Sequence, residues 1–96
     1  MPHYISLMRW TSKGMAGLPG WRERVEEGEQ IIEEAGGKLE GVYVTLGRYD
    51  VVEIFEAPND ETAVEILMKL QRFAAEHTET LRAFTREEAE QIIRRL

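Results

Sequence analysis

The sequence contains no cysteine, and this absence excludes disulfide bonds, thiolate catalysis and zinc–sulfur sites. It also contains no apolar run near the roughly 20 residues that a membrane-spanning helix needs. Basic residues are in the minority. The sequence has 12 Lys and Arg and 18 Asp and Glu, which gives a net charge of −6. Such a chain repels phosphate backbones and acidic lipids, so neither nucleic acid nor a membrane is expected as a partner.

The N-terminus lacks the basic start and apolar stretch of a signal peptide, so we expect a cytoplasmic protein. The 96 residues are 43% hydrophobic and 31% charged, which is typical of a globular protein. We therefore expect residues 1–96 to form a single domain. A domain this small buries only about 60–65% of its unfolded surface, so self-association would add useful stability.

Alternating apolar and polar residues predict four β-strands, because side chains of a strand point to opposite faces in turn. The predicted strands cover residues 3–10, 39–46, 51–56 and 78–84. The second and third are joined by a short link that contains Gly47 and Asp50, which is typical of a hairpin. Gly47 can adopt a positive φ without strain, and Asp50 can accept backbone donors in the turn.

The first predicted helix begins at Trp21 and carries an apolar stripe on one side. The glycine pair at 36–37 is a natural stop for it, because glycine takes the left-handed cap conformation freely. The preceding residues 11–20 contain three glycines and Pro19, and we predict that most of this segment is loop, with a helical turn capped by Thr11 as the alternative.

The second predicted helix begins at a cap on Asn59 or Asp60. A short third helix follows the last strand and opens with a capping box, Thr85 to Glu88. The apolar positions of the second helix recur at intervals of three and four, which predicts one buried stripe. That stripe consists of Ala63, Ile66, Leu67, Leu70, Phe73 and Ala74.

This order of elements predicts an α+β fold of the ferredoxin-like, split βαβ type, with an antiparallel sheet in the order 4-1-3-2 and two helices on one face. Strand alternation divides the side chains between two faces. We predict that the helices cover Ile5, Leu7, Val42, Val44, Val52, Ile54, Leu81 and Ala83. The other face would carry Tyr4, Ser6, Met8, Trp10, Tyr43, Thr45, Val51, Glu53, Phe55, Thr80, Arg82 and Phe84. Because this second face is rich in aromatic residues, we predict that a partner sheet covers it.

Several segments together resemble the GYD-domain family, which takes its name from residues that stand here at Gly47, Tyr49 and Asp50. The resemblance rests on Tyr4…Trp10-Thr11…Gly14, Gly36-Gly37-Lys38, Gly41…Tyr43…Thr45-Leu46-Gly47-Arg48-Tyr49-Asp50, Ala57-Pro58…Asp60 and Thr80-Leu81-Arg82-Ala83-Phe84-Thr85. It implies a member of the dimeric α+β barrel superfamily. That superfamily includes cofactor-free oxygenases, isomerases, haem enzymes and ligand-binding regulatory domains, so the resemblance implies a fold more than an activity.

Glu53 and Arg82 are the candidate catalytic pair, since both are predicted near mid-strand on the partner-facing side. They could act as general base and anion anchor. The alternative, which we favour, is a charge pair, or one end of an intersubunit pair, that satisfies buried charges at an interface. A further set of side chains could line a pocket for a small hydrophobic or aromatic molecule, or simply pack in an interface. This candidate ligand-binding set is Tyr4, Trp10, Tyr43, Tyr49, Glu53, Phe55, Arg82 and Phe84.

His3 and His77 are the only histidines, and no motif spaced for metal or haem accompanies them, so we expect no metal and no cofactor. The leading hypothesis is a homo-oligomer, a dimer or a multiple of dimers, that holds a small molecule between its sheets. One alternative is a cofactor-independent oxygenase or isomerase that works in that cavity. The second alternative is a structural or regulatory interaction module.

Overall fold

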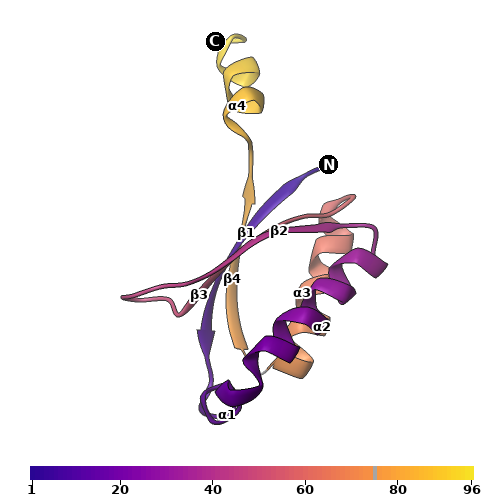
Figure 1. The fold of residues 1–96 in the computed structure, drawn as a ribbon. Helices are drawn as coiled ribbons and strands as arrows, with labels where there is room; N and C mark the ends of the chain where they lie inside the picture. The colour runs from indigo at the N-terminus through magenta and orange to yellow at the C-terminus, as the bar shows by residue number, and fades with distance from the viewer. Residues whose placement is uncertain (75) are drawn as a thin grey trace.

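The computed structural model describes residues 1–74 and 76–96, and of residues 73 and 74 it describes the backbone alone. Its sheet is four-stranded and antiparallel in the order β2-β3-β1-β4, which is the predicted order read from the other edge. Helices α2 and α3 lie on one side of the strongly twisted sheet (Figure 1). The elements run β1 (His3–Trp10), α1 (Ser12–Ala16), the 3-10 turn η1 (Leu18–Gly20), α2 (Trp21–Glu34), β2 (Lys38–Val44), β3 (Val51–Glu56), α3 (Asp60–Ala74), β4 (Glu76–Ala83) and α4 (Arg86–Ile93).

Residues 11–20 are mostly helical, so the prediction of a loop there is wrong. Thr11 Oγ1 accepts a hydrogen bond of 3.1 Å from the Gly14 amide and caps α1, as the alternative predicted. Pro19 lies in the first turn of η1, where its missing N–H would have had no intrahelical partner. The glycines of this segment therefore separate two short helical turns instead of forming one long loop.

The other predicted helix ends are confirmed by their caps. Gly36, at φ +85°, terminates α2 in the left-handed conformation. Asn59 Oδ1 accepts a hydrogen bond of 2.8 Å from the Thr62 amide at the start of α3. Thr85 and Glu88 form the reciprocal capping box of α4, because each accepts a hydrogen bond from the backbone amide of the other.

The prediction of which sheet face the helices cover is wrong for β1, β3 and β4. Tyr4 and Phe55 are buried beneath α2 and α3, where their rings stack with centroids 5.3 Å apart. Both faces of β1 and β3 carry large apolar side chains, and neither face of β4 is mainly apolar, so alternation alone could not show which face packs inward. In β2 the predicted direction is confirmed, since Val42 packs against the core and Tyr43 lies on the other face, but Val44 is 58% exposed and the helices do not cover it. The buried core consists of Tyr4, Met8, Ile32, Val51, Phe55, Ala57, Ala63, Ile66, Leu67 and Leu70.

The core also accounts for the helical stripes. Ile32 of α2 and Ile66 of α3 are fully buried, as the spacing of apolar residues predicted. Gly28 lets the two helices approach, because a Cβ there would stand 3.2 Å from Leu70 Cδ2. Phe73 and Ala74 of the predicted stripe lie outside the described side chains.

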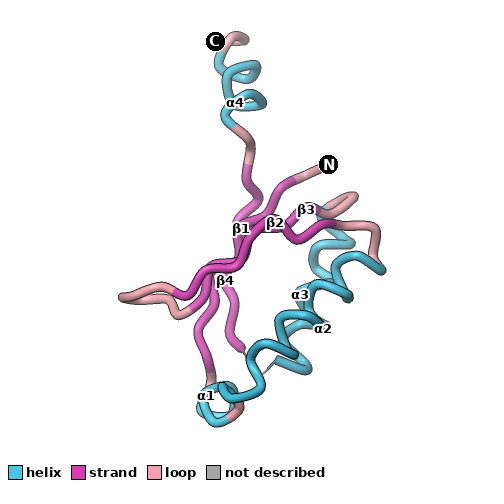
Figure 2. Tube along the Cα trace, in the orientation of Figure 1, coloured by secondary structure: helices cyan, strands magenta, loops and turns pink. Residues whose placement is uncertain are grey.

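Helix α4 extends away from the rest of the molecule, beyond the end of β4 (Figure 2). This extension contributes to principal extents of 49 × 31 × 18 Å. Its apolar residues Ile92 and Ile93, and Leu96 just after it, are exposed in the single chain. None of the helices in the described part of the chain has the length and apolar content needed to span a bilayer.

Candidate functional site: the open face of the sheet

The sheet face opposite α2 and α3, here called the open face, carries a continuous apolar centre. Its two central cross-strand rows are Leu81–Ile5–Ile54–Gly41 and Glu79–Leu7–Val52–Tyr43. Tyr43 is 60% exposed and Leu81 is 46% exposed, so these rows end in exposed apolar side chains on both edge strands. The Tyr43 ring lies over Gly41, where a Cβ would stand 3.1 Å from Tyr43 Cε2. Glycine at position 41 therefore makes room for an aromatic side chain on the open face.

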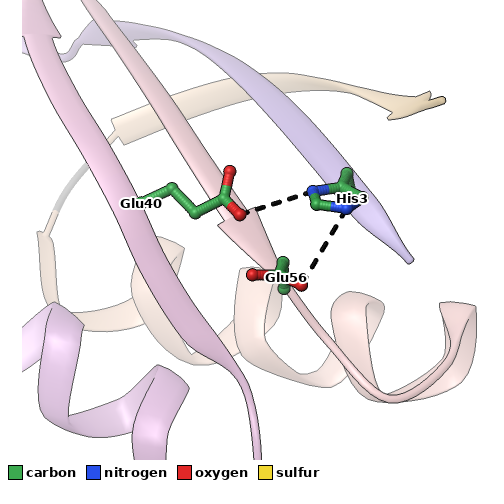
Figure 3. Close-up of side chains that lie close together, drawn as sticks. All are labelled: His3, Glu40 and Glu56. Atoms are coloured by element: carbon green, nitrogen blue, oxygen red, sulfur yellow. Dashed lines mark ion pairs between the residues drawn. The ribbon is translucent and has the colours of Figure 1, made fainter. Parts of the chain in front are cut away.

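A polar cluster marks the end of the open face where β1 begins and β3 ends. His3, Glu40 and Glu56 point toward one another from β1, β2 and β3 (Figure 3). His3 Nδ1 lies 3.5 Å from Glu40 Oε1, and His3 Nε2 lies 3.9 Å from Glu56 Oε1. The N-terminal ammonium of Met1 is 4.0 Å from Glu56 Oε1. The neighbouring Glu56 carboxylate, through a hydrogen bond and through its charge, together with partial burial, raises the pKa of Glu40.

The link between β2 and β3 lies at the opposite end of the sheet from the polar cluster. Gly47 has φ +92°, and Thr45 Oγ1 donates a hydrogen bond of 2.7 Å to the Tyr49 carbonyl. Asp50 Oδ2 accepts a hydrogen bond of 3.0 Å from the Trp10 amide, so the hairpin is tied to the end of β1. The positive φ of Gly47 confirms its predicted role. Asp50 accepts a backbone donor as predicted, but that donor belongs to β1 and not to the turn.

Tyr49 reaches from this hairpin to β4. Its Oη donates a hydrogen bond of 2.5 Å to Glu79 Oε2, and that bond, above all other causes, raises the pKa of the Tyr49 phenol. The two residues line a cavity of about 90 Å³ together with Leu7, Arg9 and His77. The tyrosine and aspartate of the motif therefore connect the β2–β3 hairpin to β4 and to β1 at one end of the sheet.

Glu53 lies beneath the helices, not on the open face, because its cross-strand partner is the buried Ser6. Its Oε1 accepts no hydrogen bond from the described residues. Burial, and next the charge of Glu76, raise the pKa of Glu53 to about 7. The adjoining cavity, which Trp21 and Arg24 of α2 also line, measures only about 20 Å³. A water molecule fits such a space, but a substrate does not.

Arg82 does not pair with Glu53, so the predicted charge pair between them is wrong. Arg82 lies opposite Tyr4 in the sheet, whereas Glu53 lies opposite Ser6, two residues further along β1. Arg82 Nε is instead 3.8 Å from Asp60 Oδ1 of α3. Its guanidinium carbon lies 4.4 Å from the centroid of the Phe84 ring. The helix-side groove between α3 and β4 beside Arg82 measures about 190 Å³, below the roughly 300 Å³ of typical ligand pockets.

The structure distributes the predicted ligand-binding residues over separate places. Tyr4, Phe55 and Trp10 belong to the core or pack against it, Tyr43 lies on the open face, and Phe84 is exposed just after β4. Whether any of the eight residues contacts a ligand stays a prediction. Sequence reasoning missed Glu40 and Glu56, although one signal was available: Leu39 and Val42 are apolar but three residues apart, which breaks strict alternation at Glu40.

Comparison with known proteins adds two findings. The sequence model of a family described as "GYD domain" matches residues 4–93 of the chain. A curated relative from Thermus thermophilus is 32% identical over 84 residues, which are 86% of this chain and 88% of the relative. That relative is named "Glutamine synthetase and cystathionine beta-lyase binding protein".

Proposed function

Because this chain belongs to the GYD domain family, we propose that it is a protein-interaction module that self-associates through its open face and docks onto larger enzymes. The single observation that carries the proposal is the apolar centre of the open face, formed by Ile5, Leu7, Tyr43, Val52, Ile54 and Leu81. Monomeric proteins seldom leave a continuous apolar surface of this kind in water.

A second copy of the chain is the occupant that suits this surface. Two sheets can stack face to face at about 10 Å, with their inner side chains interdigitated. The apolar centre is bordered by polar or charged residues at both ends, His3 and Glu56 on one side and Arg9 and Glu79 on the other. This arrangement of an apolar core within a polar rim is typical of protein–protein interfaces.

Docking onto an enzyme would use the outer surface that stacked sheets leave free. On α3, Val64 and Met68 are exposed and lie away from the core. On α4, Ile93 is also exposed. The name of the Thermus relative states that it binds two enzymes, and these exposed apolar side chains give this chain comparable points of contact.

A small molecule held between two stacked sheets is the alternative. The cavities of the single chain described above are all smaller than typical ligand pockets, so such a ligand would depend on the assembly. Tyr43 is the predicted ligand-binding residue best placed to contact it, because its ring lies on the open face.

The self-association is tested by light scattering coupled to size exclusion, with Ile54→Lys as the variant. We expect the wild-type chain at micromolar concentration to have at least twice the mass of one 11.1 kDa chain. Ile54→Lys should lower that mass to one chain, because the new charge would be buried without a partner. Val64→Lys is the matched control, since it places the same side chain on the exposed side of α3. A monomeric wild type, or an Ile54→Lys variant that is folded by circular dichroism and remains oligomeric, would contradict the proposal.

The docking is tested separately with purified glutamine synthetase and purified cystathionine beta-lyase. We expect the wild-type chain to co-elute with at least one of them, and Val64→Lys combined with Met68→Lys to weaken that association. If the chain is oligomeric but binds neither enzyme, the docking part of the proposal is wrong and the self-association part stands.

A further inference from the structure

We propose that His3, Glu40 and Glu56 form a binding site for one divalent transition-metal ion of the class of Zn²⁺. The three side chains come from neighbouring strands at one end of the open face, and they point toward a common centre (Figure 3). The proposed site is independent of the self-association and docking proposed above.

The spacing of the ligand atoms suits a metal ion. One ligand atom from each residue lies within 4.8 Å of the other two. Zinc binds imidazole nitrogen and carboxylate oxygen at about 2.0–2.2 Å, which places neighbouring ligands of a tetrahedral site roughly 3.3 Å apart. The imidazole lies between the two carboxylates, with Nδ1 3.5 Å from Glu40 Oε1 and Nε2 3.9 Å from Glu56 Oε1. One metal ion takes only one of these ring nitrogens, so the three ligand atoms would have to close in from separations of up to 4.8 Å through rotation of the three side chains.

The backbone that carries these residues is paired in the sheet, which fixes their relative positions. His3 and Glu56 are direct cross-strand partners in the β1–β3 ladder. Glu40 enters the cluster because β2 contains an extra residue: Leu39 lies opposite Phe55, and Gly41 lies opposite the next residue, Ile54. A β-bulge of this kind redirects a side chain that would otherwise follow the regular alternation.

The charges of the cluster favour a cation. Two carboxylates stand next to one another, and their side chains are only 32% and 16% exposed for Glu40 and Glu56. Carboxylates in such proximity repel each other unless a proton or a positive ion lies between them. A divalent ion balances both charges, whereas the Met1 ammonium, at 4.0 Å from Glu56 alone, supplies one positive charge at the edge of the cluster.

The donor set indicates the class of ion. An imidazole ligand favours Zn²⁺ and its first-row neighbours over Mg²⁺ and Ca²⁺, which prefer oxygen ligands throughout. Three protein ligands leave at least one coordination position for water or another group, as in zinc sites that are not purely structural. The alternative for the same geometry is a protonated imidazole that pairs with the two carboxylates and binds no metal.

The experiment is a calorimetric titration of the untagged chain with Zn²⁺ at neutral pH, because a polyhistidine tag would bind the same ion. We expect one Zn²⁺ per chain. His3→Gln and Glu40→Gln should each lower the Zn²⁺ affinity by at least about tenfold. Losing a residue that only hydrogen-bonds to a metal ligand already costs about tenfold or more, and these two residues would be ligands themselves. His77→Gln is the matched control, because it removes the other histidine of the chain and should leave the affinity unchanged.

A titration with Co²⁺ gives a second measurement on the wild-type chain. Visible absorption of the bound ion should develop with the same stoichiometry and should disappear on addition of Zn²⁺. The proposal is overturned if Zn²⁺ produces no saturable binding. It is also overturned if Glu40→Gln, folded by circular dichroism, binds Zn²⁺ as tightly as the wild type, or if His77→Gln loses as much affinity as His3→Gln.

Discussion

Tyr4 Oη donates a hydrogen bond of 2.6 Å to Asp60 Oδ1, and this bond fastens the first strand to the first turn of α3. Burial, followed by the bond to Asp60 and the Asp60 charge, raises the pKa of Tyr4 to about 12. An acidic side chain at this helix position is favourable in itself, because the helix dipole is positive at its N-terminus. Arg82 approaches the same carboxylate from β4, so one residue of α3 connects two adjacent strands.

We expect Tyr4→Phe to lower the free energy of unfolding by about 1–2 kcal/mol, because the ring keeps its packing and loses only a hydrogen bond to a charged group. Urea unfolding monitored by circular dichroism would measure the change. Tyr43→Phe, on the exposed side of the sheet, serves as the matched control and should be nearly neutral. Equal effects of the two substitutions would contradict a stabilising role for the Tyr4–Asp60 bond.

The buried Glu53 makes stability depend on pH in a defined direction. Its pKa is raised from 4.5 to about 7 in the folded chain, so the folded state binds the proton more tightly than the unfolded state. Stability should therefore be greatest below about pH 4.5 with respect to this group, fall as the pH rises toward 7, and then level off. A shift of this size corresponds to a loss of about 3 kcal/mol.

Urea unfolding over this pH range compares wild type with Glu53→Gln. We expect the variant to lose most of the decline, with a smaller slope left by Glu76, whose pKa burial also raises. Glu23→Gln, an exposed change on α2, should keep the wild-type profile. A Glu53→Gln profile as steep as the wild-type profile would reject Glu53 as the titrating group.

The separation of Glu53 from Arg82 predicts that the two residues are energetically independent. In a double-mutant cycle, Glu53→Gln and Arg82→Met should be additive to within about 0.5 kcal/mol. The companion cycle of Arg82→Met with Asp60→Asn should show coupling of about 0.5–1 kcal/mol, since that pair is in contact but near the surface. Coupling in the first cycle that exceeds the second would restore the rejected charge pair.

Gly37 is required by the close approach of the α2–β2 connection to β3. A Cβ at this position would stand 2.3 Å from the Glu56 carbonyl oxygen, and only a backbone shift could relieve that contact. We expect Gly37→Ala to destabilise the chain by about 2–3 kcal/mol, as overpacked core positions do. Gly20→Ala is the control, because a Cβ there meets nothing within 4 Å. Similar unfolding midpoints for the two variants would contradict the close approach.

Local signals in the sequence were sufficient for the four strands, for helices α2, α3 and α4, and for the order of the strands. The caps at Asn59 and Thr85 and the stop at Gly36 depend on a few neighbouring residues, and the structure confirms each of them. The same reasoning failed at residues 11–20. There the glycine and proline content led to the prediction of a loop, although Thr11 caps a helical turn. Short helical turns tolerate those residues at their ends, and composition does not distinguish such turns from a loop.

Properties that depend on distant contacts could not be predicted in the same way. Alternation separates Tyr4 from Ile5, but the packing of α2 and α3 decides which of the two is buried. Strand order makes Glu53 and Arg82 neighbours of β1, but the offset of two residues comes from register. The polar cluster required knowledge of the bulge at Glu40, and a bulge is visible in the sequence only as a lapse in an otherwise regular pattern.

The extra residue in β2 also determines how this strand responds to a change in length. Removing one residue from a regular strand turns every side chain beyond it to the opposite face. At position 40 this inversion does not follow, because Leu39 and Gly41 already occupy consecutive rungs of the ladder, opposite Phe55 and Ile54. A chain shortened by Glu40 alone would keep Val42 turned toward the helices and Tyr43 turned away from them. The sheet can therefore do without the one residue of β2 that the polar cluster needs, so the fold and the cluster can be gained or lost independently.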